Sequence, residues 1–344
     1  MIVHFASSGG GHLEELQASA VLLRQEERVW VTTNSPRASA LSGAGEAVRV
    51  LPTDARGVAQ VLRLLAASVL IAVRDRPRIV VTTGSYAAVP FCLAARLLGA
   101  RLIFVETGAR VLAPSRTGRI LAPVASRVYV QWPALVGALP GAVLLRPILL
   151  EAVEATGARP GAGAVAVMGT HPAPFQRLVA AVVHAVRAAV LPEPVFIQRG
   201  PLAASPAGIE SVEYLTPTEI EERIANAAVV ICHAGLGTIA CALRAGRRPL
   251  VMARTTRDGE HVDNHQREIV DALAALGVVV PLGAVIRPED VARALEPLAV
   301  DTTGTDAASL RQIVRQEADH PVGASPVGWL QARIRRARRP DNGR

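Results

Sequence analysis

The sequence contains no lysine, and all 37 of its basic residues are arginine. A P-loop needs a lysine beside the phosphates, and Schiff-base catalysis needs a lysine amine, so both are excluded. Aromatic residues make up only 3% of the chain. Proteins that bind single-stranded nucleic acid use aromatic side chains as stacking platforms, so we expect no nucleic-acid partner.

Long apolar runs and cysteine-rich motifs are also missing. The three cysteines fit no zinc-binding pattern, and an odd count suits a reducing compartment. The longest apolar segment, 58–73, is interrupted by Arg63, so it reads as an amphipathic or core helix and not as a membrane span. The chain opens directly on a strand-like segment, IVHFA, so we expect no signal peptide and a cytoplasmic location.

The composition that remains favours two globular domains. Half of the residues are hydrophobic, 19% are charged, and the length is 344 residues. We expect a first domain at 1–150, a linker rich in Ala, Gly and Pro at 151–163, and a second domain at 164–325. A basic tail at 326–344 fits either a solvated helix or an amphipathic segment lying on anionic lipid.

Short apolar segments alternate with segments of helical periodicity in both halves. The predicted strands are 2–6, 29–33, 48–51, 79–83, 102–106, 128–131, 164–168, 195–198, 229–232, 249–253 and 278–281. This alternation predicts an α/β fold with parallel sheets covered on both faces. Ligands of such sheets bind beyond the carboxyl ends of the strands, so two similar halves predict a cleft between them.

Glycine-bearing turns between a strand and a helix are the strongest candidates for binding sites. The first is Ser7–His12 and the second is His233–Thr238, and Gly169-Thr170 repeats the theme at the start of the second half. Glycines allow a ligand close to the backbone, and helix N-termini offer N–H groups to an anion. His12 is either a proton acceptor beside bound phosphate or a structural histidine.

Polar residues also cluster at 259–266, in a chain that is otherwise apolar. His261, Asp263 and His265 could be imagined as metal ligands, but an N-cap by Asp263 or Asn264 is the simpler interpretation. We therefore predict no metal site. Glu106 ends a predicted strand and is either a carboxylate in the cleft or part of a surface salt bridge.

These motifs resemble two known families. The first half is similar to the Alg14-type subunit of the GlcNAc transferase of dolichol-linked oligosaccharide synthesis, through SSGGGHLEEL (7–16), TTGSYAAVPF (82–91), FVETGARVLAPSRTGRIL (104–121) and YVQWPAL (129–135). The second half resembles the Alg13-type subunit and the C-terminal domain of the MurG-related family 28 glycosyltransferases, through VMGTHPAPFQRL (167–178), ICHAGLGTIACALRAGRRPLVMAR (231–254) and GEHVDNHQREI (259–269). The two halves are usually separate chains, so the sequence resembles a fusion.

The resemblance implies a GT-B fold, in which two Rossmann-like domains face each other across a cleft. It implies that the donor binds to Gly169, Thr170, His171, His233, Gly235, Gly237, Thr238, Glu260, His265 and Gln266. It assigns the acceptor to Ser8, Gly9, Gly10, Gly11, Tyr86 and Arg110, and gives His12 and Glu106 as candidates for the catalytic base. One position departs from the family pattern, because Cys241 stands where a ribose-binding Glu is expected.

The implied activity is an inverting sugar transfer without cofactor or metal. The donor would be a UDP-sugar carrying GlcNAc or another hexose or hexuronic acid. The acceptor would be a polyprenyl-diphosphate-linked saccharide at the inner face of the cell membrane, where the protein would bind peripherally. Two alternatives remain: a non-catalytic scaffold that binds UDP-sugar, and a UDP-sugar 2-epimerase.

Overall fold

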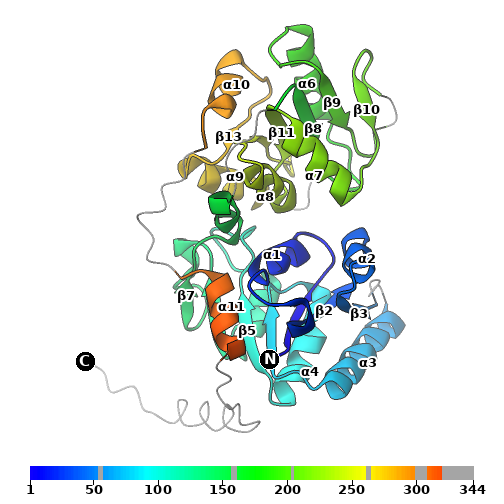
Figure 1. The fold of residues 1–344 in the computed structure, drawn as a ribbon, viewed down its shortest axis with the longest axis vertical. Coiled ribbons are helices and arrows are strands. Elements are labelled where there is room, and N and C mark those ends of the chain that lie inside the picture. Colours follow the sequence, from blue (N-terminus) through cyan, green and yellow to red (C-terminus); the bar gives the residue numbers. More distant parts are fainter. Residues whose placement is uncertain (53–56, 156–160, 203–204, 261–264, 299–307, 320–344) are drawn as a thin grey trace, which may run out of the picture.

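The computed structural model describes residues 1–52, 57–155, 161–202, 205–260, 265–298 and 308–319. These residues form two lobes, each built on a parallel sheet (Figure 1). The predicted α/β class and GT-B arrangement are confirmed. The predicted tail at 326–344 lies outside the described residues.

The first lobe has a seven-stranded sheet in the order β3-β2-β1-β4-β5-β6-β7. Its central strand β1 is buried at every position, as expected for a strand covered on both faces. The strands are β1 Val3–Ser7, β2 Arg28–Thr33, β3 Ala47–Leu51, β4 Ile79–Thr82, β5 Arg101–Val105, β6 Arg127–Val130 and β7 Ala142–Leu144. The helices are α1 Gly11–Ser19, α2 Pro36–Gly43, α3 Val58–Asp75, α4 Val89–Leu97 and α5 Arg116–Leu121, with 3-10 turns η1 Gln25–Glu27, η2 Tyr86–Ala88 and η3 Pro133–Leu135.

The second lobe has a six-stranded sheet in the order β10-β9-β8-β11-β12-β13. The strands are β8 Ala164–Val167, β9 Val195–Gln198, β10 Glu210–Val212, β11 Val229–His233, β12 Leu250–Met252 and β13 Val280–Pro281. The helices are α6 Gln176–Arg187, α7 Pro217–Asn226, α8 Leu236–Arg244, α9 His265–Ala275 and α10 Pro288–Leu295. A capping box between Thr216 and Glu219 begins α7 immediately after the loop that follows β10.

The last described helix, α11 (Leu310–Asp319), returns to the first lobe (Figure 1). Leu310, Val314 and Ala318 are buried in the core of the first sheet. Glu317 forms an ion pair of 2.8 Å with Arg101. The predicted second domain, 164–325, therefore includes a helix that packs on the first sheet, because composition alone does not reveal which sheet an amphipathic helix covers.

The predicted linker also begins too early. Residues Ile148–Ala155 form the 3-10 segment η4, which packs between α1 and α8. Glu151 is only 3% exposed, accepts a hydrogen bond of 3.0 Å from the Leu310 backbone N–H, and pairs with Arg311. The chain between the lobes is thus built into the core at its start, while residues 156–160 lie outside the described residues.

No helix in the described ranges is both long enough and apolar enough to cross a membrane. The longest apolar candidate, α3, presents Leu64, Ser68 and Ala72 to the core. Its opposite face stays exposed.

Candidate functional site

The first glycine turn joins the central strand β1 to α1. Gly9 donates its backbone N–H to Thr33 Oγ1 at 2.9 Å, and a Cβ at this position would lie 2.2 Å from Ser35 Oγ. Only glycine therefore fits here. The helix starts at Gly11 with Gly10 as its N-cap, and no side chain caps it. Its first-turn N–H groups are consequently available to a ligand.

The second glycine turn joins β11 to α8 in the other lobe. The Gly235 N–H donates to the His233 carbonyl oxygen at 2.8 Å, and no side chain caps α8. The His233 ring fills the space beside two glycines. A Cβ on Gly235 would lie 2.2 Å from His233 Nε2, and a Cβ on Gly169 would lie 2.5 Å from His233 Cε1. Both glycines are thus required by the close approach of this imidazole.

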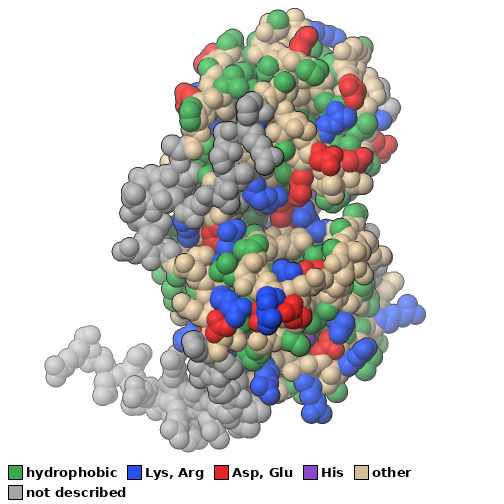
Figure 2. Space-filling model, in the orientation of Figure 1, with side chains coloured by type: hydrophobic (Ala, Val, Ile, Leu, Met, Phe, Trp, Pro, Cys, Tyr) green, Lys and Arg blue, Asp and Glu red, His purple; other side chains and the backbone are tan. Residues whose placement is uncertain are grey.

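Both turns open to one cavity of about 570 Å³ between the lobes. Figure 2 shows acidic and basic side chains gathered where the two lobes meet. The predicted residues that line the cavity are Gly9, Gly10, Gly11, Gly169, Thr170, His233, Gly235, Gly237 and Thr238. The expectation that the two turns share a crevice is therefore confirmed, while the ligand that each residue contacts stays a prediction.

His12 lies beside the cavity lining, at the start of α1. Burial, together with the nearby Arg110 guanidinium, lowers its pKa to about 4. The Thr83 hydroxyl lies 3.2 Å from the His12 carbonyl oxygen, to which it donates, and 3.2 Å from His12 Nδ1. When the Thr83 hydroxyl donates to the carbonyl oxygen, its own oxygen can accept only from Nδ1–H, the tautomer in which Nε2 carries the lone pair.

Glu106, the other predicted base, does not reach the cavity. Its side chain is fully buried and accepts hydrogen bonds from the Ser115 N–H at 2.9 Å, the Ser115 hydroxyl at 3.1 Å and the Thr107 N–H at 3.2 Å. Burial raises its pKa, and the neighbouring Glu15 carboxyl adds to this. Glu106 thus anchors its own loop and does not line the cavity, and its role as a base stays a prediction.

The remaining acceptor candidates are dispersed. Ser8 is half-buried in the first glycine turn. Arg110 is close enough to influence His12 electrostatically. Tyr86 lies at the start of η2 and is 62% exposed, outside the lining of the cavity.

Three donor candidates are committed to contacts within the second lobe. Glu260 is 5% exposed and pairs with Arg177, with one contact of 2.6 Å. Gln266 is 6% exposed and accepts the Arg254 N–H at 3.0 Å. His171 Nδ1 accepts the Ala173 N–H at 3.1 Å.

These three side chains stabilise loops and do not line the cavity, so their contact with the donor stays a prediction. His265 is the first residue of α9. His261 and Asp263, the other two imagined metal ligands, lie outside the described residues, as does the predicted cap Asn264. Within the ranges that are described, no three His, Cys, Asp or Glu side chains cluster as metal ligands would.

Sequence reasoning missed several residues that line the cavity. They are Glu14, Pro36, Arg37, Val167, Tyr214, Leu215, Thr216, Pro217, Glu219, Ile220, Glu221 and Leu236, while Cys241, singled out in the sequence, also lines the cavity. The Thr216-x-x-Glu219 capping box after a strand was a usable signal, since loops at strand ends form such sites. Burial raises the pKa of the Cys241 thiol to about 12, so it stays protonated and is a weak partner.

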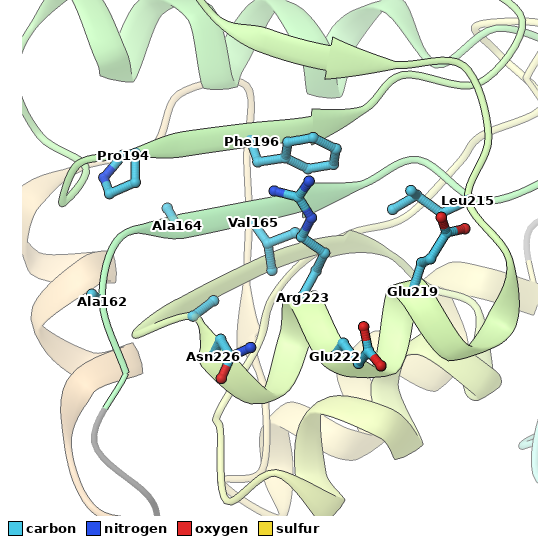
Figure 3. Close-up of a pocket in the computed structure, with 11 residues that line it drawn as sticks. Ala162, Ala164, Val165, Pro194, Phe196, Leu215, Glu219, Glu222, Arg223 and Asn226 are labelled. Atoms are coloured by element: carbon cyan, nitrogen blue, oxygen red, sulfur yellow. The ribbon is translucent and has the colours of Figure 1, made fainter.

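A second hollow of about 500 Å³ lies on the other side of α7, between that helix and strands β8 and β9. Figure 3 shows the Arg223 guanidinium over the Phe196 ring, with a distance of 3.8 Å to the ring centroid. No first-lobe residue lines this hollow, and neither glycine turn does.

Two family models match separate parts of the chain. Residues 164–316 match the glycosyltransferase family 28 C-terminal domain, and residues 46–145 match the family described as oligosaccharide biosynthesis protein Alg14 like. The first glycine turn precedes the second of these ranges.

A curated relative in Prochlorococcus marinus (strain MIT 9211) is 34% identical over 150 residues. Its name is UDP-N-acetylglucosamine--N-acetylmuramyl-(pentapeptide) pyrophosphoryl-undecaprenol N-acetylglucosamine transferase. The match covers 40% of this chain and 40% of that relative.

Two solved structures share the whole fold at low identity. MurG from Acinetobacter baumannii has a TM-score of 0.60 at 19% identity and covers 93% of this chain and 99% of its own. UDP-GlcNAc 2-epimerase from Methanocaldococcus jannaschii has a TM-score of 0.62 at 13% identity and covers 93% and 100%. The fold therefore does not separate transferase from epimerase. The chain is similar to an Alg14-like domain over residues 46–145 and to a glycosyltransferase family 28 C-terminal domain over residues 164–316.

Proposed function

We propose that this protein transfers a sugar, GlcNAc or a related hexose or hexuronic acid, from a UDP-sugar to a polyprenyl-diphosphate-linked saccharide. The observation that carries the proposal is the single cavity to which both glycine turns open. The reaction class agrees with the name of the Prochlorococcus relative. The match of residues 46–145 to the family described as oligosaccharide biosynthesis protein Alg14 like supports a lipid-linked saccharide as the acceptor.

The chemistry needs stabilisation of negative charge on the departing UDP. The uncapped N-terminus of α8 offers backbone N–H groups and the positive end of a helix dipole to a diphosphate. Thr238 lines the cavity in the first turn of the same helix and can add a hydroxyl donor. Donors of this kind make a metal ion unnecessary, and each is worth about 3 kcal/mol in comparable oxyanion sites.

His12 is the base in this proposal. In the tautomer with a proton on Nδ1, Nε2 carries the lone pair, and the pKa of about 4 keeps the ring neutral near pH 7, so Nε2 would take the proton of the acceptor hydroxyl. Arg110, close to His12, would attract the diphosphate of a lipid-linked acceptor. A single in-line displacement inverts the anomeric centre, so an α-linked donor gives a β-linked product.

The first lobe has a surface suited to the lipid that carries such an acceptor. One face of α3 exposes a stripe of apolar side chains at helical spacing: Val58, Leu62, Leu65, Val69 and Val73. Arg63 and Arg74 are exposed on the same helix. An exposed apolar stripe with flanking arginines fits peripheral contact with an anionic membrane face.

The test is turnover of purified protein in EDTA with a polyprenyl-diphosphate saccharide and a panel of UDP-sugars. We expect UDP release that depends on the acceptor and survives EDTA. The epimerase candidate, kept because of the similar fold, predicts conversion of UDP-GlcNAc without acceptor. Donor binding without any turnover would indicate a scaffold instead, and activity that EDTA abolishes would refute the metal-independent chemistry.

A further inference from the structure

A buried carboxylate of the first lobe projects into the cavity at the point where the lobes meet. Glu14, in the first turn of α1, lines the cavity and is only 8% exposed. The α1 and α8 helices contact each other here. An ideal Cβ on Gly237, in the first turn of α8, would lie 2.2 Å from Glu14 Oε2. Gly237 therefore allows this carboxylate to lie against α8.

The two oxygens of Glu14 are only partly satisfied. Oε2 accepts a hydrogen bond of 3.3 Å from Arg37 Nη2. Oε1 accepts no hydrogen bond from the described residues, and Arg244 Nη1 lies 3.6 Å away. A carboxylate has about four lone-pair sites, and leaving them empty in a buried position is costly. The vacant positions therefore point to a ligand that donates hydrogen bonds.

The chemistry of the carboxylate selects the ligand group. A diphosphate has only acceptor oxygens, so it can accept from the α8 N–H groups but has no hydrogen bond to offer the Glu14 carboxylate. Hydroxyl groups are compact donors, and a nucleotide sugar carries them on its ribose and on the transferred sugar. Cys241 lines the same cavity, but its neutral thiol is a weak acceptor and does not compete for these hydroxyls.

We propose that Glu14 is a donor-binding residue supplied by the first lobe, which accepts hydrogen bonds from hydroxyl groups of the nucleotide sugar held on the second lobe. Arg37 and Arg244 hold the carboxylate in place from either lobe. Donor binding would then fill the vacant lone pairs and draw the two lobes together. This inference rests on the proposed function and adds the residue that recognises the donor hydroxyls.

The experiment compares three ligands by calorimetry: UDP, 2′,3′-dideoxy-UDP and UDP-GlcNAc. The variants are Glu14→Ala, Glu14→Gln, which keeps the shape and one acceptor oxygen, and the control Glu222→Ala, whose side chain lines the second hollow (Figure 3). We expect Glu14→Ala to bind UDP about 10- to 100-fold more weakly than the wild type, as for a hydrogen bond to a charged group. Glu14→Gln should show a smaller loss, and the control none.

The dideoxy ligand decides whether the loss comes from hydroxyl recognition. It should bind the wild type and Glu14→Ala about equally, because the groups that Glu14 contacts are missing. If UDP affinity is unchanged and only UDP-GlcNAc weakens, the hydroxyls are those of the transferred sugar and the inference stands. Equal losses for all three ligands, or no loss for any, overturn it. A wild type that binds no UDP overturns the proposed function as well, so the two failures are distinguishable.

Discussion

The clearest test of His12 as the base is the dependence of the rate on pH. An ordinary histidine with a pKa of about 6.5 loses most of its neutral form on acidification, so kcat/KM would fall about tenfold between about pH 7.5 and about pH 5.5. Burial and the nearby Arg110 lower the pKa of His12 to about 4. With this value the neutral form remains above roughly 95% over that range, so we expect a nearly level profile.

The assay is acceptor-dependent UDP release across this pH range, at low donor concentration for kcat/KM and at saturating donor and acceptor for kcat. His12→Ala should lower kcat by about 10²- to 10⁴-fold, the usual contribution of a general base. The control is His184→Ala, an exposed histidine of α6, which should behave as the wild type. A wild-type profile that drops near pH 6.5, or a His12→Ala variant with normal kcat, would show that His12 does not act as argued.

The lowered pKa of His12 also predicts how the stability of the fold depends on pH. Because burial lowers the pKa of His12, the unfolded chain takes up the proton first as the pH decreases. The free energy of unfolding should therefore fall between about pH 6.5 and about pH 4, and His12→Ala should remove this part of the decrease.

Two further predictions concern the helices at the edges of the first lobe. Replacing both Leu62 and Val69 of the exposed α3 stripe by Gln should reduce binding to anionic vesicles at least tenfold, as measured by sedimentation, because each apolar side chain buried in the membrane contributes about 1.5–3 kcal/mol. The control is Leu276→Gln, at an exposed position of the second lobe. Equal binding by the double variant and the control would contradict the assignment of this face to the membrane. Leu310→Ala, at a fully buried position of α11, should destabilise the first lobe by about 2–5 kcal/mol in denaturant unfolding monitored by tryptophan fluorescence, since Trp30 and Trp132 are both buried in this lobe. Leu295→Ala, at a position 55% exposed, should change the stability little. An unchanged midpoint for Leu310→Ala would mean that α11 is not part of this core.

Much of the fold could be predicted because the signals are local. Apolar segments such as 79–83 and 229–232 predict buried parallel strands, and the structure has β4 and β11 at these positions. The strands β7 and β10 and the helix α2 were missed, since strands of three residues are too short to show a pattern and α2 buries only Ala38 and Leu41. The glycine turns were found because their polar and glycine residues interrupt an apolar chain between a strand and a helix.

The site was predicted less completely, for a physical reason. Glu106 and Gln266 were predicted to face the cleft, yet Glu106 accepts a hydrogen bond from Ser115 and Gln266 accepts one from Arg254, and neither lines the cavity. Glu14 carried no distinguishing local signal, because its importance arises only from α1 meeting α8. Hydrogen-bond partners that are distant in sequence decide whether a polar side chain is structural or available to a ligand.

By itself, the sequence determined the two parallel sheets, the positions of the glycine turns and the absence of lysine chemistry, because strand periodicity, backbone freedom and residue type are properties of short segments. Only the tertiary structure decided that α11 covers the first sheet, that Glu106 is buried away from the cavity, and that Glu14 reaches across to Gly237. These outcomes depend on which surfaces meet when the lobes pack, and burial and proximity across the interface have no counterpart in local sequence.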